Sequence, residues 1–221
     1  MKRLAFGLLV AFAAVAALVP SAASSASAGA KEWQVTITNL TPPGSQLLSA
    51  PLFVVHSTQA DIWSVGDFAA RPVAAIAEDA NNAPAEARIP QHPGVLTVFT
   101  GAGDAIAPGA TQTYTVETSG AFNRLTILTM LVNTNDGFTG LDSLHVHGQG
   151  TTLETVAYDA GSERNNELAA FIPGPCCNHP FVRDPTHEPI HMHPGITGRG
   201  DLDPAVYGWN GPVARIEITR D

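Results

Sequence analysis

Residues 125–142 have the sequence Leu125-Thr-Ile-Leu-Thr-Met-Leu-Val-Asn-Thr-Asn-Asp-Gly-Phe-Thr-Gly-Leu-Asp142. The first eight residues are apolar or β-branched, which is typical of a buried strand. The chain becomes apolar again at Gly140-Leu-Asp-Ser-Leu-His-Val146. Between these parts lie residues that favour loops and mostly carry oxygen side chains, namely Asn133, Asn135, Asp136 and Gly137. This stretch therefore predicts two strands joined by a polar loop.

Segments of similar character lie on both sides of this stretch. Residues 32–40, 111–118 and 213–219 place apolar or β-branched residues at every second position, whereas other segments are short apolar runs. Gly, Pro or Asn bound these segments, which predicts strands. Many short strands of this kind indicate a mainly all-β protein, and we expect an antiparallel β-sandwich. The expected strands are residues 32–40, 51–56, 95–99, 111–118, 123–132, 141–146, 151–158 and 213–219.

One segment has helical spacing instead. Residues 67–80 are rich in alanine, and Pro72 lies near the first turn, where a missing N–H costs little. The loop before it, residues 61–66, carries two large apolar side chains that we expect to close over the core. Residues 173–200 are dense in Pro, Gly and His and predict a long irregular loop. The residues that predict the end of the helix are Asn81, Asn82 and Pro84.

The N-terminus predicts a secretory signal peptide over residues 1–28. Lys2 and Arg3 precede an uncharged apolar run, and Ala26-Ser27-Ala28 fits a cleavage site with small residues. A retained membrane anchor is the alternative, but the apolar run is short, and no later stretch is apolar enough to span a bilayer. We therefore expect a single domain over residues 29–221 that is secreted, with the periplasm or the cell surface as other destinations.

The net charge and the cysteine content limit the classes of partner and the redox state that we expect. Removing residues 1–28 takes away two basic residues and no acidic one, so the formal charge falls from −9 to −11. This balance disfavours a nucleic-acid partner, because phosphate binding needs clustered Lys and Arg. The only cysteines are the neighbours Cys176 and Cys177. An oxidising destination leaves two readings open, a disulfide between them or two thiols that are free or paired between molecules.

A second polar segment, Tyr158-Asp-Ala-Gly-Ser-Glu163, complements the loop around Asp136. Asp159 and Glu163 are four residues apart, and the small residues between them let the chain curl so that both carboxylates point inward. Three carboxylates brought together repel one another unless a cation is present. Ca²⁺ takes about six to eight oxygen ligands in uneven geometry. The alternative is that these are ordinary turn residues, and the spacing does not fit an EF-hand.

The two segments, Met130–Asp142 and Tyr158–Glu163, resemble the hallmark segments of the spondin N-terminal (F-spondin) domain. The resemblance covers about residues 32–220. Further similarity to bacterial members lies in Val35–Asn39, Ala74–Asp79, His193–Ile196 and Gly198–Asp201.

This resemblance implies a β-sandwich similar to C2 domains, with Ca²⁺ held between loops by Asp136, Asp159 and Glu163. Two residues depart from the animal proteins: Gly137 stands where they usually have Trp, and Glu163 stands where they have Asp. The cysteines of the animal domains are absent, so their disulfide pattern does not carry over. Asp142 is expected to be structural, on the strand that follows.

Histidines suggest a different kind of site. His145 with His147, and His191 with His193, form two His-x-His pairs that suit zinc or copper, with His179 and His187 nearby in the sequence. The competing explanation is that these are turn residues and exposed histidines in Pro-rich loops. No Gly-x-Ser-x-Gly segment supports a serine triad.

These observations lead to three hypotheses. The first is a secreted calcium-binding module for adhesion or cell-surface interaction, not an enzyme, whose partner is an extracellular or cell-surface protein or glycan. The second is an exported metalloenzyme or metal-binding protein that uses the two histidine pairs. The third is a structural envelope protein in which calcium only stabilises the fold.

Overall fold

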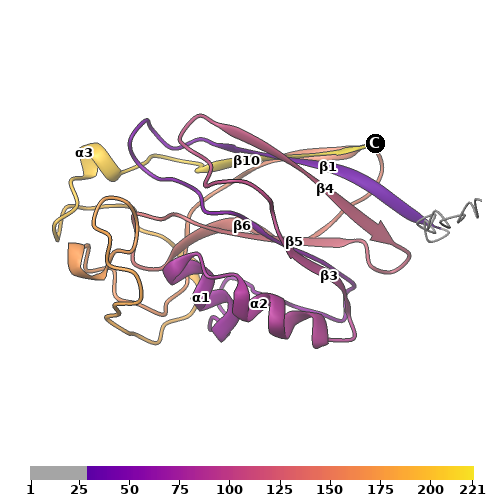
Figure 1. Cartoon of the computed structure of the whole chain (residues 1–221), viewed down its shortest axis with the longest axis horizontal. Helices are drawn as coiled ribbons and strands as arrows, with labels where there is room; N and C mark the ends of the chain where they lie inside the picture. Colours follow the sequence, from indigo (N-terminus) through magenta and orange to yellow (C-terminus); the bar gives the residue numbers. More distant parts are fainter. Residues whose placement is uncertain (1–28) are drawn as a thin grey trace, which may run out of the picture.

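Two antiparallel sheets form the described part of the chain, residues 29–221 of a computed structural model (Figure 1). The expected signal peptide lies outside the described residues. The first sheet has the strand order β4 (Thr111–Ser119), β1 (Ala30–Asn39), β10 (Ala214–Arg220), β7 (Gly150–Thr155). The second has the order β3 (Val95–Thr100), β2 (Leu52–His56), β5 (Arg124–Met130), β6 (Gly137–His145), β8 (Tyr158–Asp159), β9 (His191–Met192). The prediction of a mainly all-β antiparallel sandwich is confirmed.

The main core lies between the two sheets and follows from the alternation in the sequence. Val35 and Ile37 of β1 and Ile216 of β10 point inward from the first sheet, and Phe53 of β2 and Ile127 of β5 point inward from the second. Successive residues of a strand point to opposite faces, so the polar residues between them face away from this core. Burial of these apolar side chains is the main stabilising term of the sandwich.

A second core lies on the other face of the six-stranded sheet, where two helices cover it (Figure 1). α1 (Arg71–Asp79) packs Val73 and Ile76 against Leu52, Val54 and Leu128 of the sheet. β2 is therefore buried at every position, which explains why its sequence is apolar without alternation. α2 (Ala83–Arg88) follows α1 and contributes Ala85 to the same core.

The loop at residues 61–66 closes over this second core, as expected for its large apolar side chains. Trp63 is buried, and its ring meets the edge of Phe138 with centroids 5.0 Å apart. Trp63 thus belongs to the core between the helices and the six-stranded sheet, and not to the core between the two sheets.

The helix prediction was wrong at its start, whereas the predicted end at Ala80 lies within one residue of the observed end. α1 begins at Arg71, because residues 67–70 are not helical and lie beside the long irregular segment. Phe68 forms a β-bridge with Pro189, and the Ile190 N–H donates to Asp67 O (2.7 Å). Pro72 occupies the first turn, as expected. Pro84 does not end helical structure but lies in the first turn of α2, where proline is equally tolerated. A third short helix, α3 (Pro204–Tyr207), is capped by Asp203, whose Oδ1 accepts the Ala205 N–H at 2.8 Å.

Two strand boundaries also differ from the prediction. Residues 151–158 are not one strand: the chain leaves β7 in the first sheet and enters β8 in the second. β6 begins at Gly137, so the polar break after β5 is shorter than the sequence indicates. β6 requires glycine at position 140, because a Cβ there would lie 1.8 Å from Ile127 O of the neighbouring strand β5.

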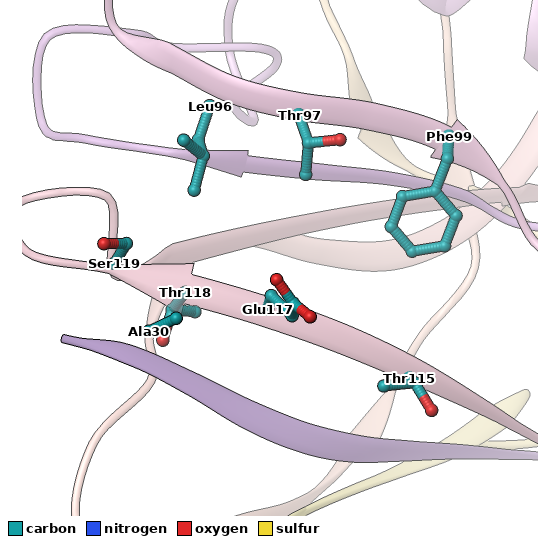
Figure 2. A pocket seen from close by; sticks show the side chains of 8 residues that line it. All are labelled: Ala30, Leu96, Thr97, Phe99, Thr115, Glu117, Thr118 and Ser119. Atoms are coloured by element: carbon teal, nitrogen blue, oxygen red, sulfur yellow. The ribbon is translucent and has the colours of Figure 1, made fainter. Parts of the chain in front are cut away.

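An open cleft of about 550 Å³ separates the edge strands β3 and β4 (Figure 2). Leu96 and Phe99 line it from β3, and Thr115 and Glu117 line it from β4. In the six-stranded sheet, β3 is one edge strand and β8 lies next to the other edge, so this cleft is remote from the expected cation loops.

Two further findings concern the cysteines and the membrane. Cys176 and Cys177 form a disulfide with each other, which decides between the two readings. Both pack against a small cluster around Ile172. Among residues 29–221, no helix is long and apolar enough to cross a membrane.

Candidate cation site

The two polar loops predicted from the sequence lie next to each other. Gly137 in β6 pairs directly with Asp159 in β8, so the loop that precedes β6 and the loop that follows β8 emerge on the same side. Asp136 O accepts the Ala160 N–H at 3.1 Å, which joins the two loops. In Figure 1 the loops after β8, coloured orange to yellow, gather at the end of the sandwich opposite the C-terminus.

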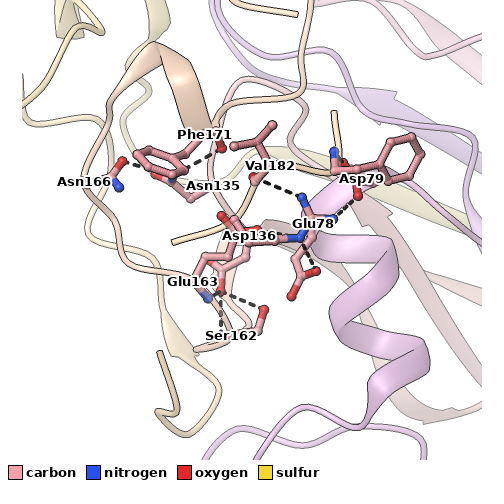
Figure 3. A network of polar contacts seen from close by, with 11 residues as sticks. Glu78, Asp79, Asn135, Asp136, Ser162, Glu163, Asn166, Phe171 and Val182 are labelled. Atoms are coloured by element: carbon pink, nitrogen blue, oxygen red, sulfur yellow. Dashed lines mark hydrogen bonds and ion pairs between the residues drawn. The ribbon is translucent and has the colours of Figure 1, made fainter. Parts of the chain in front are cut away.

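Asp136 is wholly buried and is held through only one of its carboxylate oxygens (Figure 3). Its Oδ2 accepts hydrogen bonds from Ser162 N (2.8 Å), Ser162 Oγ (3.2 Å) and Glu163 N (2.9 Å). Its Oδ1 is buried and accepts no hydrogen bond within residues 29–221. Burial, and then the negative charge of Asp159, raise the pKa of Asp136 to about 7.

Asp159 is also buried and forms the first residue of a tight turn. Its Oδ1 accepts the Gly161 N–H at 2.7 Å, and its Oδ2 accepts from the Asn165 side-chain amide. Gly161 adopts φ +68°, and a Cβ there would lie 2.1 Å from Glu188 O, so only glycine fits. The curl expected from the small residues between Asp159 and Glu163 is thus present.

Glu163 is 2% exposed and faces Arg183. The Arg183 Nε lies 2.8 Å from Glu163 Oε1, but its N–H is directed at Glu78 Oε2 at 2.7 Å. The same guanidinium pairs with Asp79, so it lies next to three carboxyl groups at once. Burial, and then the charge of Glu78, raise the pKa of Glu163 to about 9.

The neighbouring asparagines hold the loops and are themselves satisfied. Asn133 Nδ2 donates to Ser45 O (2.8 Å), and its Oδ1 accepts the Cys176 N–H (3.2 Å). Asn135 Oδ1 accepts the Glu167 N–H at 3.3 Å. These contacts tie the loop before β6 to the loops that follow β8, so the two asparagines position Asp136 and are not free donors for a ligand.

The chemistry of the donors fits a hard cation. Among the described residues, Asp136 Oδ1 and both Glu163 oxygens are buried without a hydrogen-bond donor, which is costly for ionised carboxylates. Oxygen ligands from irregular loops suit Ca²⁺ better than Mg²⁺, which demands regular geometry. As the side chains stand, however, no group of three or more His, Cys, Asp or Glu among residues 29–221 is arranged to hold a metal ion. Arg183 supplies the positive charge beside Glu163 instead.

The contacts that Arg183, Glu78 and Ser162 make at this site were not predicted from the sequence. Arg183 lies 20 residues after Glu163 in the irregular segment, and Glu78 lies in α1, so no local spacing connects them. Ser162 acts through its backbone N–H as well as its hydroxyl, and a backbone contact leaves no mark on residue type. Asp142 lies on β6 and accepts a hydrogen bond from Ser64 Oγ at 3.0 Å, in keeping with a structural role.

The two His-x-His pairs do not form one site. His145 ends β6, whereas His191 lies in β9, whose neighbour β8 pairs with the first residues of β6. The pairs therefore lie at opposite ends of β6. His193 is buried, and burial lowers its pKa to about 4; its Nδ1 accepts the Gly195 N–H at 3.0 Å. His187 stacks on Phe68, with ring centroids 4.2 Å apart.

Comparisons with known proteins add no family. A scan against protein-family models found no model that matches the chain. A search of curated proteins found no matching relative. The functional argument therefore depends on the geometry of the two loops.

Proposed function

We propose that this protein is an exported calcium-binding β-sandwich module that acts in adhesion or in extracellular or cell-surface interaction. The observation that supports this proposal most is Asp136, which is wholly buried yet keeps one carboxylate oxygen without a hydrogen-bond donor. Asp159 and Glu163 lie beside it and are also almost completely buried. In its ionised form, such a set of carboxylates is favourable only with a positive charge among them.

In this proposal, Asp136, Asp159 and Glu163 provide carboxylate ligands, and backbone carbonyls and water provide the others. Calcium neutralises the buried charges and links the loop before β6 to the loop after β8. When calcium is absent, Arg183 lies beside Glu163, and the raised pKa keeps the Glu163 carboxyl protonated below about pH 9. Binding therefore requires Glu163 to lose its proton and to turn from Arg183 to the metal.

The partner surface lies beside these loops. Phe181 and Val182 are exposed apolar residues, and they immediately precede Arg183. The Phe181 N–H donates to Asp79 Oδ1 at 3.0 Å, so this segment is connected to the same acidic cluster. An ion that changes the pairing of Arg183 also changes the presentation of these two side chains, which would couple calcium to binding of a cell-surface protein or glycan.

The direct test of ion binding is thermal unfolding of chelator-treated protein with and without millimolar calcium. We expect calcium to raise the Tm of the wild type and to leave that of Asp159→Asn unchanged. Asp142→Asn is the matched control, because it removes a carboxylate of β6 outside the two loops, and its Tm should still rise. Absence of a rise in the wild type with any divalent cation would contradict the proposal.

The interaction role needs a separate experiment. Labelled protein is applied to intact producer cells with calcium or with chelator. We expect surface binding only with calcium and only when Asp159 is intact. If calcium raises the Tm but surface binding is the same with chelator, the ion has only a structural role, as in an envelope protein.

A further inference from the structure

We infer that His145 and His147 form a two-histidine site for a transition-metal ion such as Zn²⁺, Cu²⁺ or Ni²⁺, separate from the candidate calcium site. Both side chains are exposed, whereas Val146 between them is buried. Two residues that flank an inward-pointing one share the outer face of an extended chain. The extended backbone thus places the two imidazole rings side by side on one face.

The distance between the rings fits one shared metal ion. Their centroids are 4.9 Å apart, and their planes are inclined by 44°. A metal–nitrogen bond of about 2.0–2.1 Å places each ring centroid about 3.2 Å from the ion. Two such rings at angles between square-planar and tetrahedral would have centroids roughly 4.5–5.2 Å apart. The observed separation lies within this interval, so the spacing of the two rings is compatible with one shared ion.

The backbone that carries the two rings is fixed on both sides. The Val146 N–H donates to Asn123 O at 2.8 Å, which continues the pairing of β6 with the preceding strand. The Gly150 N–H donates to His147 O at 3.3 Å and closes the turn into β7. A ligand pair on fixed backbone loses less conformational entropy on binding than a pair on a free loop.

The space in front of the rings suits an ion that keeps water ligands. His145 and His147 line the same hollow of about 160 Å³, and Gly150, Thr151 and Ile218 line the rest of it. Arg124, which pairs with His145 across the sheet, donates to Ser143 O (2.7 Å) and lines a different hollow beside Asp142. The site is therefore open, with two protein ligands and room for water.

The donor type separates this site from the calcium loops. Neutral imidazole nitrogens favour Zn²⁺, Cu²⁺ and Ni²⁺, whereas Ca²⁺ favours oxygen. The turn lies beside the C-terminus, since the Arg220 N–H donates to Gln149 O at 3.2 Å. The calcium loops lie at the other end of β6, so the two sites do not share residues and can be tested independently.

The test is a calorimetric titration of the full, chelator-treated protein with copper alone, and separately with zinc alone, in millimolar calcium. We expect one ion per chain. Either His145→Asn or His147→Asn should weaken binding by about 100-fold or more, because the gain from two linked donors is lost. His179→Asn is the matched control, since His179 is also an exposed loop histidine, and binding should be unchanged.

Electron paramagnetic resonance of the copper-loaded protein provides a second readout that does not depend on affinity. Two equatorial imidazole nitrogens should be resolved in the wild type and one at most in either single variant. The inference is overturned if the wild type does not bind these ions, or if only one of the two substitutions weakens binding. It is equally overturned if His179→Asn weakens binding as much as they do.

Discussion

Asp136→Asn should stabilise the calcium-free protein and remove its response to calcium. In the wild type, the pKa of Asp136 is about 7, compared with an ordinary value of 3.8. As the pH rises through this interval, the unfolded chain loses the proton while the folded chain retains it. The free energy of unfolding therefore falls between about pH 4 and pH 7 and is lowest above pH 7.

The size of this effect follows from the shift. About three pH units correspond to about 4 kcal/mol of lost stability at pH 8. For a chain of this length, that equals roughly 10 °C in Tm. The asparagine carries no charge, and its amide can donate towards the neighbouring carboxylates. In chelator, Asp136→Asn should thus melt several degrees above the wild type at pH 8. At pH 4 the two proteins should melt at a similar temperature.

The assay is differential scanning calorimetry of both proteins at pH 4 and pH 8, each with chelator and with millimolar calcium. The order of stability should reverse at pH 8, because calcium raises the Tm of the wild type alone. If Asp136→Asn lowers the Tm in chelator as much as it does in calcium, then Asp136 is an ordinary hydrogen-bonded aspartate, and the argument for a buried unsatisfied charge is refuted.

Two other substitutions test the surroundings of the site. Arg183→Gln should lower the stability of the calcium-free protein by about 3–5 kcal/mol, because it leaves the clustered carboxylates of Glu78 and Asp79 without their counter-ion. Calcium should recover part of this loss in chemical denaturation; an equal loss with and without calcium would show that Arg183 and the ion do not compete. Gly161→Ala should reduce the Tm far more than Gly109→Ala. Both glycines have positive φ, but only at Gly161 would a Cβ meet backbone, 2.1 Å from Glu188 O. Similar losses of Tm in the two variants would contradict the tight turn.

The sandwich was predictable because its strands alternate. β1 buries every second residue from Trp33 to Asn39, as its sequence indicates, and β4 does so from Tyr114 onwards. The helical region was less predictable. Nothing local distinguishes Pro84 as the start of α2 from a proline that ends α1, because proline suits both positions. The non-helical form of residues 67–70 depends on contacts with Pro189 and Ile190, far along the chain.

The candidate site was predictable to the extent that its residues lie in local patterns. The turn from Asp159 to Glu163 is visible in the small residues between them, and its neighbour Asp136 follows a recognisable strand end. Arg183 could not be found in this way, because it reaches Glu163 from an irregular segment. Because Arg183 pairs with these carboxylates, it is also part of the site. A search of the sequence for oxygen ligands does not find it.

The central claim is that the buried carboxylates around Asp136 bind calcium, and isothermal titration with calcium tests it most directly. Chelator-treated wild type should bind one calcium ion per chain, Asp142→Asn should bind it equally, and Asp136→Asn and Asp159→Asn should not bind it. Wild-type protein that binds no calcium, or an Asp136→Asn variant that binds it as the wild type does, would contradict the claim.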